Sequence, residues 1–339
     1  MTPKNILFLN GLPDNRQVEV NSIDRNNIMH YLLQGSTNIA QKLNTDQIIP
    51  ASVVFDTNSK QDINAASNIN AIFNEISDAD THIIALAKAQ KLYNTFSDKL
   101  PFLNIPASVL KTTREQIYTL LRGIDKLHVP KTVRIQPRSA SDIYEAIKKE
   151  GFEFPVIFRQ AGEHNAKNML IIKDKTEEFY PYALDRRYYY LTQFVESAQN
   201  GVYAKFRLVV VDGEVYIRHV LFGDKPIVNH RKFMEKNKKY QKEEEEILTT
   251  FDTAIKPKIQ TIVKEIYDTL KLDYFGLDCV IDEKFNILLF EANANMDILT
   301  NTHKEDTLLA SKIQTIKDAV VTMINKRIDA SIPPKEKNS

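Results

Sequence analysis

The chain has few of the residues on which common cofactor sites depend. Its 339 residues include one cysteine, Cys279, no tryptophan and only nine glycines. A single cysteine excludes both an internal disulfide and a cysteine-rich zinc site. Neither GxGxxG nor GxxxxGK[ST] occurs, so the two commonest glycine-rich nucleotide-binding motifs are absent from the sequence.

Positive and negative charges are nearly balanced along the chain. Lys and Arg number 45, and Asp and Glu number 44. Because nucleic-acid-binding proteins usually carry a basic excess, we expect no nucleic-acid partner. No apolar run approaches the roughly 20 residues of a membrane span, and the first run, residues 6–9, is shorter than a signal-peptide core. We therefore expect a soluble, cytoplasmic protein without a membrane partner.

The first third of the chain alternates short apolar runs with helical patterns. Residues 5–9, 48–55 and 82–86 have the pattern of strands, whereas residues 68–76 and 89–96 carry apolar side chains at helical spacing. Alternating strands and helices favour a parallel sheet with crossover helices.

A long polar connection, residues 10–27, follows the first of these strands. In a parallel sheet such a loop lies at the carboxyl edge of its strand, where ligands bind. Asp14, Arg16 and Arg25 are therefore candidate substrate contacts.

Strand-like runs follow one another after Gly151, and Asp212-Gly213 between two of them is a strong hairpin signal. This region therefore favours an antiparallel sheet. A long helix is expected over residues 250–270, and a strand pair over residues 273–282 and 286–292. The fold class expected for the whole chain is α/β followed by α+β.

The strand pair near the C-terminus carries acids where core residues are expected. Asp278 lies between Leu277 and Cys279, and Glu291 ends an apolar strand two residues before Asn293. Residues i and i+2 of a strand face the same side, so Glu291 and Asn293 point together, with Asp278 roughly opposite. Two carboxylates and an amide oxygen are ligands that Mg²⁺ prefers. Pairing of these acids with Lys or Arg side chains is an open alternative.

This pattern, an Asp in one strand and then an apolar strand ending Glu-x-Asn, resembles the metal-binding hairpin of the ATP-grasp superfamily. The chain is most similar to RimK and glutathione-synthetase-like ligases, and especially to the ATP-grasp region of uncharacterised bacterial proteins with tetratricopeptide repeats. The resemblance extends from about Asn104 over most of the chain. It implies binding of ATP and Mg²⁺, with Mn²⁺ as an alternative metal. It also implies an acyl phosphate that an amine or another nucleophile attacks.

The resemblance implies a division of the chain into domains. Residues 1–110 would form a Rossmann-like domain, residues 111–190 a linker helix and the small ATP-grasp subdomain, and residues 191–330 the large subdomain with the Mg²⁺ site. Residues 331–339 would form a polar tail. The resemblance is compatible with a homodimer.

The resemblance also implies roles for particular residues. Asp278, Glu291 and Asn293 match the metal ligands. Arg207, Arg159 and Lys205 would be catalytic, stabilising charge on the transferring phosphoryl group. The implied nucleotide-binding residues are Arg114, for which Lys111 and Arg134 are alternatives, Arg159, Gly162, His164, Lys167, Gln193, Phe194, Val195 and Arg207.

Three functions are consistent with the sequence. The first is an ATP-dependent ligase that joins a small-molecule or peptide carboxylate to an amine or another nucleophile. The second is a peptide-modifying ligase or a phosphotransferase on the same scaffold. The third is a nucleotide-binding regulatory protein without catalysis, because Gln193 and Lys205 depart from the family pattern and the phosphate loop is poor in glycine. His219 and His230 could contact substrate or phosphate.

Overall fold

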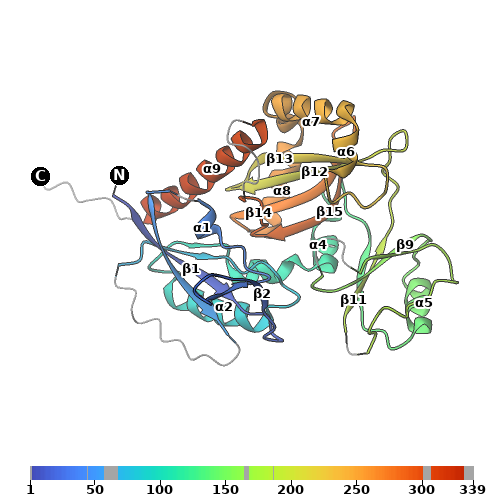
Figure 1. The fold of residues 1–339 in the computed structure, drawn as a ribbon, viewed down its shortest axis with the longest axis horizontal. Helices are drawn as coiled ribbons and strands as arrows, with labels where there is room; N and C mark the ends of the chain where they lie inside the picture. Colours follow the sequence, from blue (N-terminus) through green and yellow to red (C-terminus); the bar gives the residue numbers. More distant parts are fainter. Residues whose placement is uncertain are drawn as a thin grey trace, which may run out of the picture.

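The computed structural model describes residues 2–43, 45–56, 68–163, 168–185, 187–300 and 307–331. Two residues implied for the nucleotide site, His164 and Lys167, lie outside the described residues, as does most of the expected tail. Three main sheets are arranged along the molecule, with the N-terminal sheet and the C-terminal helix at one end and a small antiparallel sheet at the other (Figure 1).

The N-terminal sheet is parallel, as the alternating pattern predicted. Its order is β4-β1-β5-β6. The bounds are Lys4–Gly11 for β1, Ile48–Phe55 for β4, Ala71–Asn74 for β5 and Phe102–Leu103 for β6.

Two expectations for this region are wrong. Residues 68–76, expected to be helical, contain strand β5, whose four residues are all buried and therefore lack the alternation that identifies a half-buried strand. Residues 82–86, expected to be a strand, begin helix α2 (Ile83–Phe96). The helix buries Ala85, Leu86, Ala89 and Leu92, which recur at i, i+1, i+4 and i+7 and so form one apolar side of an amphipathic helix.

The polar connection after β1 contains a hairpin that the sequence did not indicate. Strands β2 (Glu19–Ile23) and β3 (Met29–Leu32) pair antiparallel, and all five residues of β2 are exposed. Helix α1 (Ile39–Leu43) follows.

The small sheet is antiparallel, in the order β10-β9-β11-β8. Helix α5 (Ala140–Lys149) covers it with Ile143 and Ile147. The rings of Phe158 and Tyr189 stack beneath, with centroids 4.6 Å apart. The bounds are Thr132–Ile135 for β8, Val156–Gln160 for β9, Leu170–Ile172 for β10 and Tyr189–Gln193 for β11.

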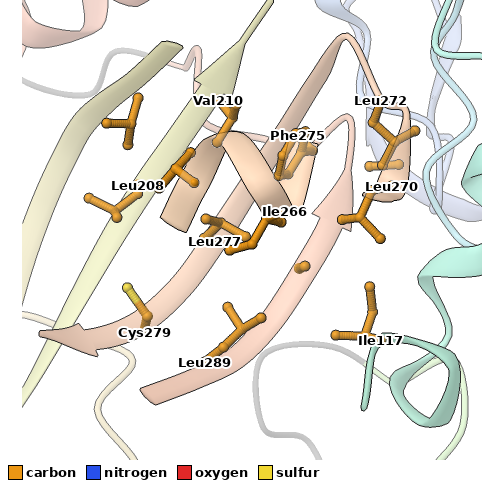
Figure 2. Packing of buried hydrophobic residues seen from close by; sticks show 14 of the residues in the cluster. Ile117, Leu208, Val210, Ile266, Leu270, Leu272, Phe275, Leu277, Cys279 and Leu289 are labelled. Atoms are coloured by element: carbon orange, nitrogen blue, oxygen red, sulfur yellow. The ribbon is translucent and has the colours of Figure 1, made fainter. Parts of the chain in front are cut away.

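The large sheet carries the predicted C-terminal hairpin, in the order β13-β12-β14-β15-β7. One face packs on helix α8 (Lys256–Leu270), where Leu208, Leu277 and Leu289 lie against Ile266 and its neighbours (Figure 2). The strand bounds are Leu127–His128 for β7, Tyr203–Val211 for β12, Glu214–Gly223 for β13, Tyr274–Ile281 for β14 and Ile287–Ala294 for β15. The other elements are α3 (Pro106–Val109), η1 (Leu110–Thr112), α4 (Arg114–Leu121), α6 (Lys232–Lys236), α7 (Lys238–Thr250) and η2 (Phe251–Ile255).

Helix α9 (Leu308–Ser331) joins the N-terminal and large sheets. Its Ile316 and Val320 share a buried cluster with Phe8 of β1 and Val209 of β12. The two sheets therefore bury one continuous apolar layer. Among the described residues, no helix has the length and apolarity needed to cross a membrane.

Asn104 connects the same two sheets through polar contacts. Its Oδ1 accepts hydrogen bonds from the backbone N–H groups of Asp273 (2.7 Å) and Tyr274 (3.0 Å). Its Nδ2 donates to the Tyr274 carbonyl (2.8 Å) and to Asn295 Oδ1 (2.6 Å). The side chain is fully buried, so none of these partners can turn to water if it is removed.

We expect Asn104→Ala to lower the free energy of unfolding by about 2–4 kcal/mol, because buried donors and acceptors would lose their partners. Urea unfolding measures this loss. The control is Asn94→Ala, since Asn94 is exposed on α2. Equal stabilities of the two variants would contradict the importance of this contact.

Candidate functional site

A cleft of about 920 Å³ lies where the three sheets meet. The N-terminal sheet contributes the segment after β3, the small sheet contributes β9 and β11, and the large sheet contributes β12 to β15. Of the residues implied for the site, the cleft lining includes Arg114, Arg159, Gly162, Gln193, Phe194, Val195, Lys205, Arg207, Asp278, Glu291 and Asn293. The sequence thus identified side chains that the fold brings together from distant parts of the chain.

The strand register explains the alignment of the acidic corner. Arg207 of β12 pairs with Asp278 of β14, and Asp278 pairs with Glu291 of β15. Directly paired residues of neighbouring strands face the same side of a sheet. Asn293, two residues after Glu291, lies on that side as well. The register slips immediately after Asp278, which lets the buried strand continue while this residue keeps facing the cleft.

Asp278 accepts from two cations. Arg207 donates from Nε to Oδ1 (2.7 Å) and from Nη2 to Oδ2 (2.8 Å), and Lys205 Nζ lies 3.2 Å from Oδ2. Burial acts to lower the pKa of Arg207, but the hydrogen bonds and charge of Asp278 raise it above its usual value. Two neighbouring cations such as Lys205 and Arg207 repel each other unless an anion lies between them. In the structure the chain's own Asp278 carboxylate does so.

Glu291 is held by Arg114 and Asn293. Arg114 Nη2 lies 2.9 Å from Glu291 Oε1, and Asn293 Nδ2 donates to the same oxygen at 2.5 Å. The alternative left open by the sequence, that these acids pair with basic side chains, is therefore confirmed for Asp278 and Glu291.

The chemistry of this donor set suits Mg²⁺. Each carboxylate offers about four lone pairs, so an acid that already accepts hydrogen bonds can still share an oxygen with a metal. Within the described residues, no group of three or more His, Cys, Asp or Glu side chains could hold a metal ion. A metal here would need Asn293 and ligand oxygens to complete its shell, as Mg²⁺ commonly does with phosphates.

Arg159 lines the cleft, and its guanidinium has few hydrogen-bond acceptors among the described residues. It is buried, its Nη2 donates to the Glu163 carbonyl, and its Nε has no partner among the described residues. Burial, with a contribution from nearby Arg114, lowers its pKa to about 10. A buried guanidinium that lacks a full set of acceptors is well suited to a phosphate.

Gly162 differs from the expectation for a phosphate loop. Its N–H donates to Oδ2 of Asp80 (3.3 Å), which lies in the loop between β5 and α2, so this donor is engaged within the chain. Because the resemblance implies that Gly162 binds nucleotide, its N–H would be expected to approach a phosphate oxygen. For Gly162 that contact is taken by a carboxylate.

Gln193, one of the residues implied for nucleotide binding, lines the cleft, but several of its polar groups already form hydrogen bonds within the chain. Its backbone N–H donates to Lys131 O (2.8 Å), its Oε1 accepts from Glu153 N (3.1 Å) and its Nε2 donates to Glu153 O (2.8 Å). The role of Gln193 toward adenine remains a prediction. Phe194 and Val195 also line the cleft, where their backbone could read a base edge.

Several weaker candidates do not belong to the cleft lining. Asp14 accepts from the N–H groups of Ile83 and Ile84, so its carboxylate serves the first turn of α2. Arg134 pairs with Asp80 at 3.5 Å. The candidates that the lining does not include are Asp14, Arg16, Arg25, Lys111, Arg134 and His230, whereas Glu19 of the same polar connection, which the sequence analysis did not select, is included.

His219 lies in the cleft lining directly across the strand pair from Arg207. Its Nε2 is buried without a partner among the described residues. Burial and the charges of Arg207, Arg218, Lys205 and Arg231 hold its pKa well below the usual range. The imidazole is therefore neutral at physiological pH.

We expect His219→Gln to make stability less dependent on pH. Because the pKa of His219 is lowered from 6.5 in the folded state, the unfolded chain binds the proton more readily, and stability falls as the pH drops below about 6.5. This loss is about 1 kcal/mol between roughly pH 7.5 and pH 5.5. Urea unfolding at both pH values should show it in the wild type and in the exposed control His230→Gln. An undiminished loss in His219→Gln would contradict the assignment.

Known structures share this fold. A D-alanine–D-alanine ligase from Bacillus anthracis complexed with ATP aligns over 96% of this chain and 98% of its own, at 12% identity and a TM-score of 0.55. D-alanyl-alanine synthetase A from Vibrio cholerae aligns over 97% and 99%, at 13% identity and 0.55. A RimK domain ATP-grasp protein from Sphaerobacter thermophilus aligns over 96% and 99%, at 12% identity and 0.51. No protein-family model and no curated protein sequence matches the chain. At these identities the likeness establishes the fold.

Proposed function

Because the chain has the ATP-grasp fold, we propose that it is an ATP-dependent ligase that joins a carboxylate to an amine or another nucleophile. The observation that carries this proposal is the acidic corner of Asp278, Glu291 and Asn293, which adjoins Arg207 through strand register and Arg114 through an ion pair in one cleft. Carboxylates and cations side by side are what Mg-ATP and its transferring phosphoryl group require.

The proposed reaction has two steps. A carboxylate oxygen of the substrate attacks the γ-phosphorus of ATP and forms an acyl phosphate and ADP. The nucleophile then attacks the carbonyl carbon, loses its proton and releases inorganic phosphate. Such chemistry needs positioning and electrostatic stabilisation more than covalent help from the protein.

The residues of the chain divide this work. Arg159 and Arg207 would stabilise the equatorial oxygens of the transferring phosphoryl group, and Lys205 would hold Asp278 in place. Asp278, Glu291 and Asn293 would hold Mg²⁺, which when bound neutralises charge on the β- and γ-phosphates. The apolar wall formed by Ile157, Ile171 and other lining residues would exclude water from the acyl phosphate.

A phosphotransferase or a peptide-modifying ligase could use the same corner, and a regulatory protein could bind the nucleotide without turnover. The engaged N–H of Gly162 and the committed side chain of Gln193 favour keeping the regulatory reading as the second candidate. A neutral, buried His219 opposite Arg207 favours catalysis instead, because it adds an uncharged polar group where a reacting anion would lie.

The test begins with calorimetry of AMP-PNP binding with and without Mg²⁺. Binding that requires Mg²⁺ supports the proposed site and is followed by a screen for ADP release with pools of carboxylates and amines. ADP release that needs both substrates supports a ligase. A stable phosphorylated product without a nucleophile indicates a phosphotransferase. Tight binding without ADP release from any pool would favour the regulatory reading.

A further inference from the structure

Asp80 is an acid of the N-terminal domain whose side-chain partners lie on the small sheet. It belongs to the loop between β5 and α2, and its side chain is only 12% exposed. Tyr190 of β11 donates its hydroxyl to Oδ1 at 2.6 Å, and Gly162 donates its N–H to Oδ2 at 3.3 Å. Arg134 of β8 lies 3.5 Å from Oδ1.

The surroundings of Asp80 make these contacts necessary. Burial raises its pKa in spite of the Tyr190 hydrogen bond, and the charge of Asp78 adds to the increase. A buried carboxylate that loses its donors costs several kcal/mol. In the docked arrangement, the donors from Tyr190 and Gly162 offset part of the cost of burying the Asp80 carboxylate.

The backbone packing at Gly162 is fitted to the same contact. Gly162 has φ +76°, and a Cβ at this position would lie 2.3 Å from Thr81 Cγ2. The loop between β5 and α2 therefore packs directly against the backbone at Gly162. Asp78 fixes that loop by accepting the N–H groups of Asp80 (2.8 Å) and Thr81 (3.1 Å).

The loop also reaches the acidic corner. Residues 77–80 border a small hollow together with Arg114, Gly162, Glu291 and Asn293. One segment of the N-terminal domain therefore contacts Gly162 and borders the same hollow as the proposed metal corner.

We propose that Asp80 is a positioning residue that latches the small sheet to the N-terminal domain and thereby sets how tightly nucleotide phosphates are held. The latch consists of Asp80, Tyr190, Gly162 and Arg134. Its effect on nucleotide rests on the function proposed above, whereas the latch itself does not. Through it, the N-terminal domain, in which substrate contacts were expected, is connected to Gly162, which the resemblance implies for nucleotide binding, and this gives a route for coupling between the two sites.

The test uses the full chain and two variants, Asp80→Ala and Tyr190→Phe. Hydrogen exchange of the free protein should be at least about 10-fold faster in Asp80→Ala for peptides that contain Gly162, because its N–H loses its acceptor. Tyr190→Phe removes a single hydroxyl, and should show a smaller increase in the same peptides. The control Asp98→Ala removes an exposed acid beyond the other end of α2 and should exchange as the wild type does.

Calorimetry with Mg²⁺ and AMP-PNP is the second readout. The Kd should rise about 10-fold in Asp80→Ala, in line with the loss of charge-assisted hydrogen bonds, and stay unchanged in Asp98→Ala. Unchanged exchange in both latch variants would overturn the latch. Faster exchange with an unchanged Kd would overturn its role toward nucleotide. Absence of binding in the wild type would count against the proposed function, while the exchange experiment would still decide on the latch.

Discussion

Glu291→Gln should reduce substrate-dependent ADP release by about 100- to 1000-fold while leaving the protein folded. The substitution keeps the size of the side chain and an acceptor for Asn293, but it removes the negative charge that a metal ion needs. Glu291 is a better test position than Asp278, because the side chains of Glu291 and Arg114 are each 20% exposed, whereas that of Asp278 is 7% exposed. Arg114 can therefore turn to water when the charge of Glu291 is lost. Steady-state ADP release and the thermal midpoint measure the two effects.

The matched control for this experiment is Glu283→Gln. Glu283 is exposed in the turn between β14 and β15, so the same chemical change is made on the same hairpin away from the cleft. Its turnover should equal that of the wild type. Full activity of Glu291→Gln would remove Glu291 from the metal site and with it the main support for Mg-ATP chemistry.

The acidic corner could be predicted because its geometry is local. Asp278, Glu291 and Asn293 belong to one hairpin, and the alternation of strand residues places their side chains on one face without knowledge of the rest of the fold. Arg207 was implied by the family resemblance, and its strand β12 pairs with that hairpin through Asp278. In such cases a short-range rule and the three-dimensional structure agree.

The contacts of Asp80 could not be predicted for the opposite reason. Its partners Tyr190 and Gly162 are 110 and 82 residues away, and no periodicity connects positions on different sheets. Tyr190 followed two other tyrosines in an apolar run and had the pattern of simple strand packing. The hydrogen bond from its hydroxyl to Asp80 depends on how the small sheet packs against the loop between β5 and α2, which the sequence pattern does not show.

The errors in secondary structure have a similar origin. Residues 68–76 gave a helical spacing because a buried strand and its polar flanks happened to place apolar residues three and four apart. Asp14 was selected as a substrate contact because of its place after β1, but the first turn of α2 competes for the same carboxylate. Tertiary burial and capping decided both cases.

Asp278→Ala is expected to lower the free energy of unfolding by about 3–5 kcal/mol, because it would leave two cations without their counter-ion in a largely buried site. The Asp278 side chain is 7% exposed, and those of Lys205 and Arg207 are 15% and 27% exposed. Urea unfolding measures the loss. The variant will also lack turnover, but that result alone cannot separate a lost metal ligand from a damaged corner.

A second substitution isolates the counter-ion role of Asp278. In Asp278→Ala/Arg207→Met the more extensively bonded cation is replaced by an apolar side chain of similar length, so a large part of the lost stability should return. Turnover should not return, because the metal ligand and the phosphate-binding guanidinium are both absent. Stability that stays low in the double variant would show that the cost arises from packing around Asp278 rather than from unpaired charge. Recovery of stability in the double variant would assign Asp278 the role of counter-ion to Arg207.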